Sequence, residues 1–332
     1  MTARVAAAVL GLTVASGAFA SDACSTTAIR AAAEVSVSDG SSFEIEALFH
    51  TADHSSIRHI YRDRPDRSTV VEGPSAWIMS GAETSVGSEF HKLFALGHQY
   101  HAFLIEFGAI LGNVRETESI EFGGSRHKAT SGDYPFGGVV HSIHGESTER
   151  PVGLVFDFGE TARIEVAFSD WRQVGGRDLP FLAIIDDGDR VFDYRYTSID
   201  LEPQSPLWFY EALPAPMIND VQIHRLHRKL LVAHCLGDAA MMAELTAPAV
   251  FSANRGQLRS ASNDELLERF SSLFEQLDYR EYHDLIEPVV EVSGSGDLGW
   301  IAVEVRAVGE ARESGQAFDD QWAWLMAVKK FN

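Results

Sequence analysis

The chain has 332 residues, of which 45% are hydrophobic and 23% are charged. This composition excludes a disordered or collagen-like chain, and the length suffices for two domains that each bury a core. The net charge of −21, from 27 basic and 48 acidic side chains, repels phosphate backbones and anionic membrane surfaces, so we expect no nucleic-acid partner. Two cysteines exclude a disulfide-rich scaffold and a cysteine-only zinc site.

The first twenty residues have the pattern of a secretory signal peptide. Arg4 gives a short basic region, Val5–Val14 is an apolar segment too short to span a bilayer, and residues 18–20 are the Ala-Phe-Ala that a signal peptidase reads. We expect cleavage after this segment and a periplasmic or secreted mature chain. A buried N-terminal helix is one alternative. A lipoprotein anchored at Cys24 is another, although residues 21–23 lack the apolar residue of a lipobox.

The mature chain offers one choice of cysteine chemistry. Cys24 and Cys235 are its only cysteines, and an exported chain lies where disulfides persist. The two side chains form either a bridge between the N-terminus and the second half or two free, buried thiols. No later stretch reaches the roughly 18 apolar residues of a transmembrane helix, so we expect no integral membrane segment.

Most of the sequence from Ser42 to Ile199 is typical of strands, because β-branched and aromatic residues alternate between Gly, Asp and Pro. The clearest hairpin turns at Asp187-Gly188. Residues 87–111 lack this alternation and favour a helix that is interrupted at Gly97. We therefore predict a β-rich domain over residues 21–205 with one helical insertion.

The composition changes at residues 206–217, where three prolines and no strand period indicate a connection between domains. Beyond it the apolar period becomes helical and then returns to strands. The predicted helices are 219–236, 238–245 and one that begins at Ser262; the predicted strands are 279–292, 299–308 and 316–329. This order predicts an α+β domain over residues 218–332, and α+β as the fold class of the chain.

The second domain resembles the nuclear transport factor 2-like superfamily, which includes polyketide cyclases and ketosteroid isomerases. The resemblance is carried by the segments VQIHRLHRKLLVAHCLGDAAMMAEL, ASNDELLERFSSLF, YREYHDLIEPVVEVSGSGDLGWIAVEVRAVG and GQAFDDQWAWLMAVKK. It implies a cone-shaped domain whose curved antiparallel sheet encloses an apolar cavity. The family holds isomerases, dehydratases and non-catalytic modules, so the resemblance does not fix an activity.

The first domain resembles the periplasmic lipoprotein-carrier fold in its layout. A leader is followed by the strands FEIEALF, SIRHIYRD and SAWIMSG, a helical insertion, and further strands that end in FDYRYTSID. The resemblance implies an open half-barrel that encloses an apolar cavity. A different antiparallel barrel would give the same pattern.

Candidate functional residues of the second domain are acids, aromatics and one arginine. Acid–base chemistry on a small substrate would use Tyr282, Asp284 and Asp320, since a dry cavity raises carboxylate pKa values. The candidates for ligand contacts are Arg255, Trp300, Trp322 and Trp324. Core packing is the alternative for the tryptophans, and a loop turn is the alternative for the arginine.

Three histidines of the helical insertion are the best metal candidates. His98 and His101 are three residues apart, which on one helix places both imidazoles on the same face, and His91 lies near them. The alternative is a polar helix face without metal. No cofactor motif is present in the sequence, and we expect no cofactor.

Three functions fit these observations. The first is a non-catalytic exported protein that binds an apolar or amphipathic small molecule. The second is an isomerase or dehydratase in the C-terminal domain. The third is a partner-binding module that forms a homodimer through the C-terminal sheet, with Trp322 and Trp324 at the interface.

Overall fold

The computed structural model describes Cys24 and residues 28–329, except residues 74, 136, 146–149, 161, 202–208, 210–212, 214–217 and 255–256. The predicted signal peptide and Arg255 therefore lie outside the described residues, as does most of the predicted connection.

Residues 29–200 form one antiparallel sheet of thirteen strands. Its spatial order is β6-β5-β4-β3-β2-β1-β13-β12-β11-β10-β9-β8-β7, so β6 and β7 are the two edges. The strands are β1 (Ile29–Val37), β2 (Ser42–Thr51), β3 (His54–Ile60), β4 (Arg67–Glu72), β5 (Ser75–Ser80), β6 (Glu83–Val86), β7 (Gly112–Phe122), β8 (Ser125–Asp133), β9 (Val139–His144), β10 (Pro151–Asp157), β11 (Arg163–Val174), β12 (Arg177–Asp186) and β13 (Val191–Asp200).

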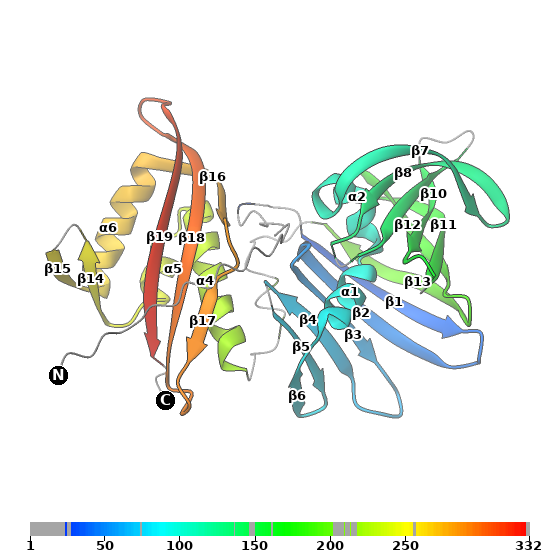
Figure 1. Cartoon of the computed structure of the whole chain (residues 1–332), viewed down its shortest axis with the longest axis horizontal. Coiled ribbons are helices and arrows are strands. Elements are labelled where there is room, and N and C mark those ends of the chain that lie inside the picture. The colour runs from blue at the N-terminus through cyan, green and yellow to red at the C-terminus, as the bar shows by residue number, and fades with distance from the viewer. Residues whose placement is uncertain are drawn as a thin grey trace, which may run out of the picture.

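Two helices connect the opposite edges of this sheet. Because α1 (Glu89–Gly97) and α2 (Tyr100–Ile110) follow β6 and precede β7, the chain has to cross the sheet between them. Figure 1 shows both helices within the curve of the sheet. The predicted helical insertion and its interruption at Gly97 are confirmed, since α1 ends at that residue.

The inner face of the sheet packs against these helices. In β2, the alternate residues Ile45, Ala47 and Phe49 are buried in one core cluster with Leu96 of α1 and Phe103 of α2. Register shifts in the β1–β13 and β2–β3 ladders mark bulges, which bend strands and increase their twist. The result is an open, curved sheet with a helix-lined hollow.

The second half begins with helices and ends with strands. In its four-stranded sheet, β18 pairs with β16 and β17 along one side and with β19 along the other. A separate hairpin lies between α5 and α6 in the chain. The elements are α4 (Asn219–Leu236), α5 (Ala239–Glu244), β14 (Ala249–Asn254), β15 (Gln257–Ser262), α6 (Asn263–Gln276), β16 (Leu277–Asp284), β17 (Val289–Val292), β18 (Leu298–Ala311) and β19 (Ala317–Lys329).

Local chemistry sets the helix ends of this half as predicted. α4 ends at Gly237, whose φ of 64° is the left-handed conformation that favours glycine. α6 begins with a capping box, in which the Ser262 side chain accepts from the Glu265 backbone and the Glu265 carboxylate accepts from the Ser262 backbone.

The predicted fold class, α+β, is wrong, because the described residues are mostly strands. In the described part of the chain, nineteen strands fall into three antiparallel sheets, and thirteen of them belong to the N-terminal sheet. The helices of the second half lie where they were predicted, but the first half contains more strands than its pattern indicated. For example, β7 and β8 are rich in charged and polar residues and carry little hydrophobic alternation.

The two halves meet where α4 lies beside the outer face of the N-terminal sheet (Figure 1). Val221 of α4 packs with Leu48, Val70 and Trp77 of that face, and Phe209 of the predicted connection joins the same cluster. Strands β2 to β5 are therefore covered on both faces only at the end that meets α4.

Candidate ligand-binding cavity

A cavity of about 780 Å³ lies between the inner face of the N-terminal sheet and α1. This volume falls within the range of roughly 300–1,000 Å³ that is typical of small-molecule pockets. Ten aromatic side chains line it, namely Phe43, Tyr61, Phe90, Phe94, Tyr100, Tyr134, Phe156, Phe158, Phe192 and Tyr194. The aromatic wall makes burial of an apolar ligand favourable.

The periodicity of the strands and of α1 explains why these aromatic side chains all point into the cavity. Phe192 and Tyr194 are two residues apart in β13, so both side chains leave the same face of the sheet. Phe90 and Phe94 are four residues apart in α1, which places both on one helix face, and their rings are stacked with centroids 6.3 Å apart. Sheet and helix thus contribute opposite walls.

Two histidines in the wall are uncharged at neutral pH. Burial and, to a smaller extent, electrostatic repulsion from His98, Arg67 and Arg64 together lower the pKa of His59 to about 3. Burial also lowers the pKa of His98, whose Nδ1 donates to the Phe94 carbonyl at 2.7 Å. The two imidazoles therefore act as neutral aromatic rings.

Three buried tyrosines of the wall are also neutral. Burial raises the pKa of Tyr100, Tyr134 and Tyr194 above the ordinary value. The Tyr134 hydroxyl donates to the Leu93 carbonyl at 3.0 Å, which ties the sheet to α1. The deep wall of the cavity thus offers apolar surface without a charged group.

We expect His59 to make folding stability depend on pH. Its folded pKa lies below its unfolded value of 6.5, so the unfolded chain binds more protons and stability falls as pH decreases through 6.5. Between pH 7 and pH 5 this histidine should cost about 2 kcal/mol of unfolding free energy. Urea unfolding at both pH values measures this loss. Between pH 7 and pH 5, the unfolding free energy of the variant His59→Phe should fall by about 2 kcal/mol less than that of the wild type. An equal loss in both proteins would contradict the assignment.

The predicted metal candidates do not form a site. His98 and His101 do not share a helix, because α1 ends at Gly97 and α2 begins at Tyr100. His91 accepts a hydrogen bond from the Ser88 backbone, and His101 Nε2 donates to the Pro180 carbonyl at 2.9 Å. Within the described residues, no group of three His, Cys, Asp or Glu side chains could hold a metal ion.

The three candidate acid–base residues lie on the helix-facing side of the C-terminal sheet. Tyr282 pairs with Ala307, which pairs with Asp320, so these residues form one row across the strands. Asp284 lies in the next row, and its Oδ1 accepts from His227 Nε2 at 2.7 Å. No sequence pattern links His227 with Asp284, since they are 57 residues apart on different elements.

The space around Tyr282, between α4 and the C-terminal sheet, is filled by side chains. Tyr282 is buried in a cluster with Leu231 and Val232 of α4 and with Val305 of β18, and burial raises its pKa well above the ordinary value. Asp320 is exposed to solvent. The row therefore begins in the core and ends at the surface.

The candidate tryptophans divide between the two faces of this sheet. Trp322 and Trp324 pack against the core cluster, and the Trp324 ring lies 5.3 Å from that of His227. Trp300 pairs with Ala327, and both side chains lie on the other face of the sheet, away from α4. The predicted interface role of Trp322 and Trp324 is therefore wrong, because both point toward α4.

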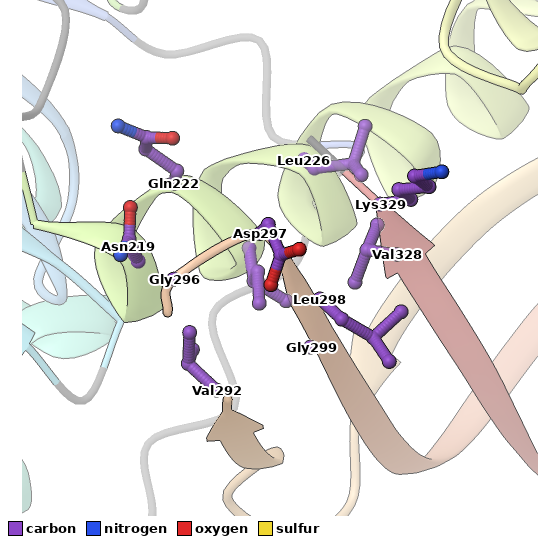
Figure 2. A pocket seen from close by; sticks show the side chains of 11 residues that line it. Asn219, Gln222, Leu226, Val292, Gly296, Asp297, Leu298, Gly299, Val328 and Lys329 are labelled. Atoms are coloured by element: carbon purple, nitrogen blue, oxygen red, sulfur yellow. The ribbon is translucent and has the colours of Figure 1, made fainter. Parts of the chain in front are cut away.

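A smaller pocket of about 200 Å³ lies at the end of the C-terminal sheet where the turn between β17 and β18 meets α4. Figure 2 shows Asn219, Gln222 and Leu226 of α4 on one side of it and the turn around Asp297 on the other. Hydrogen bonds from Ser295 and Ser293 lower the pKa of Asp297, so its carboxylate organises the turn. The volume is below that of typical small-molecule sites.

The residues that line the N-terminal cavity were not predicted as a site. They come from several strands, from the loops between strands, from α1 and from the start of α2, and they share no motif spacing. One signal was present: aromatic residues at alternate positions, as in Phe156 and Phe158 or Phe192 and Tyr194, place rings on one face of a strand.

No protein-family model matches the chain, and no curated protein matches it. Among solved structures, the chain is similar to a LolA superfamily protein from Nitrosomonas europaea, with a TM-score of 0.37 and 11% identity over 54% of this chain and 87% of that protein. It is also similar to a DUF1329 family protein from Desulfovibrio piger, with a TM-score of 0.38 and 10% identity over 57% of this chain and 92% of that protein.

A third similarity is to MucB in a complex with MucA, with a TM-score of 0.19 and 9% identity over 88% of this chain and 76% of that protein. Within the described part of the chain, no helix is both long and apolar enough to cross a membrane.

Proposed function

We propose that this chain is an exported protein of two domains, residues 21–205 and 218–332, that binds an apolar or amphipathic small molecule without transforming it. The observation that carries the proposal is the cavity of about 780 Å³, whose buried inner wall is aromatic and neutral. Such a wall stabilises apolar surface and cannot accept an isolated buried charge without a large cost.

Two features support export to the periplasm or the exterior. The first is the signal-peptide pattern of the first twenty residues. The second is a disulfide between Cys24 and Cys235, whose Cα atoms are 5.0 Å apart. Disulfides of this kind persist in oxidising compartments and are rare in the cytosol.

The other sequence-based hypotheses stay predictions. The C-terminal half does place helices before long strands, which supports the resemblance to the nuclear transport factor 2-like superfamily. Its outward sheet face carries Trp300 and the 69% exposed Leu325, which would serve a homodimer. Acid–base catalysis would require Asp284 to act while His227 donates to it.

Filling the cavity tests the proposed function. Gly97 lines the cavity, and a Cβ atom built on it would have only the Tyr134 hydroxyl within 4 Å, at 3.7 Å, so the variant Gly97→Leu should fold with its side chain inside. We expect the variant to bind the uncharged fluorescent probe N-phenylnaphthylamine about tenfold more weakly than the wild type, a loss of about 1.4 kcal/mol. Fluorescence titration measures both dissociation constants.

The matched control is Gly108→Leu, a substitution of the same type in the neighbouring helix α2. Gly108 is exposed, and a Cβ atom there would meet nothing within 4 Å. Its dissociation constant should equal that of the wild type. Equal affinity of the Gly97→Leu variant, or no binding of the probe to the wild type, would sink the proposed function.

A further inference from the structure

Arginines surround the opening of the N-terminal cavity. Arg62 and Arg64 lie in the loop between β3 and β4, and Arg190 lies in the hairpin between β12 and β13. All three line the cavity, and all three are exposed to solvent. They are therefore placed where a ligand would enter, in contrast to the neutral deep wall.

Two of these arginines have no acidic partner. Within the described residues, neither Arg62 nor Arg64 forms an ion pair, whereas the nearby Arg58 pairs with Asp66 at 2.6 Å. The Arg64 guanidinium lies 3.7 Å from the centre of the Tyr61 ring, which holds it at the aromatic rim. The chain has 48 acidic residues and only 27 basic ones, so two arginines whose charge is not balanced by an ion pair are unusual in it.

The acidic groups at the opening do not cancel this charge. Asp63 and Asp187 also line the cavity, and Asp187 lies 3.4 Å from Arg190, so three arginines face two aspartates. The pKa of His59 in the wall agrees with a positive potential at the opening. Burial and His98 lower this pKa most, and the positive charges of Arg67 and Arg64 lower it as well. The remote acidic residues of the chain are screened beyond about 8 Å at physiological ionic strength.

We infer that the ligand is an anionic amphiphile, with its apolar tail in the aromatic cavity and its carboxylate or phosphate at Arg62 and Arg64. A guanidinium matches the geometry of both anions and can donate two hydrogen bonds to either of them. The inference rests on the proposed function, because the arginines select a head group only if the cavity holds the tail.

The test compares ligands that share a tail and differ in the head group. Dodecanoate, dodecyl phosphate and dodecanol each displace N-phenylnaphthylamine from the purified full-length protein, and the displacement curves give their affinities. At least one anion should bind about tenfold more tightly than the alcohol, because each charge-assisted hydrogen bond adds that much affinity or more. Preference for dodecanoate indicates a fatty acid, and preference for dodecyl phosphate indicates a phosphate-bearing lipid.

The double variant Arg62→Gln/Arg64→Gln should lose the preference for the anion and keep the wild-type affinity for dodecanol. The control variant Arg126→Gln/Arg177→Gln removes the same charge from two exposed arginines in other hairpins of the sheet that do not line the cavity, and it should keep the preference.

The outcomes separate the inference from the proposed function. Equal affinity of the wild type for all three ligands overturns the anionic head group and leaves the binding cavity in place. A preference that persists in the Arg62→Gln/Arg64→Gln variant, or that also disappears in the control, overturns the role of these two arginines. Absence of probe binding by the wild type overturns the proposed function itself.

Discussion

Replacing Glu72 by alanine is expected to lower the free energy of unfolding by about 3–5 kcal/mol. Glu72 lies in β4 and is 1% exposed, and its two carboxylate oxygens accept from Arg225 of α4 at 2.6 and 2.7 Å. Trp77 Nε1 donates to the same carboxylate at 2.8 Å. Without the acid, the Arg225 charge stays buried between the two halves with its main partner gone. Urea unfolding at neutral pH measures the loss.

Two comparisons identify the cause. The double variant Glu72→Leu/Arg225→Met replaces the pair by apolar groups and should recover most of the lost stability, because no buried charge is left. Glu310→Ala breaks an exposed pair with Arg280 and should cost only about 0–1 kcal/mol. A Glu72→Ala variant as stable as the Glu310→Ala variant would show that water solvates Arg225 at this interface.

Features that depend on neighbouring residues were predictable from the sequence. The ends of α4 follow from helical periodicity and from Gly237, which adopts a left-handed conformation. The start of α6 follows from Ser262 and Glu265, which cap each other over three residues. The hairpin at Asp187-Gly188 follows from turn chemistry, and β12 and β13 pair on either side of it.

Features that join distant segments were not predictable in this way. β1 pairs with β13, which lies at the far end of the first half of the chain, and this pairing joins strands β1–β6 and β7–β13 into one sheet. The alternation of a strand fixes which residues share a face, but it does not say what covers that face. Leu48 and Val70, for example, face α4, which begins only at Asn219.

The same limit explains the candidate site of the second half. Strand alternation correctly places Tyr282 and Asp284 on one face. It does not reveal that Leu231 and Val232 of α4 fill the space above Tyr282, nor that His227 reaches Asp284 from the same helix. The larger cavity lies instead in the first half of the chain, between α1 and the strands that carry the aromatic side chains.

Removing the disulfide is expected to lower the free energy of unfolding by about 3–5 kcal/mol, because the bridge closes a long loop in the unfolded chain. Cys24 and Cys235 are 211 residues apart in sequence, so the bridge excludes a large set of open conformations. In the folded protein both cysteines pack against the core cluster of the second half, next to α4. The variant Cys24→Ser/Cys235→Ser, compared with the wild type by urea unfolding, measures the effect.

Reduction of the wild type provides the control for the serine side chains. Dithiothreitol should lower the stability of the wild type to nearly that of the double variant and leave the double variant unchanged. Because Cys24 follows the predicted cleavage site closely, the bridge also anchors the new N-terminus of the mature chain to α4, and the double variant should lose residues there first under limited proteolysis. A variant as stable as the oxidised wild type would mean that the unfolded chain is already compact, so that closing the loop removes little conformational freedom.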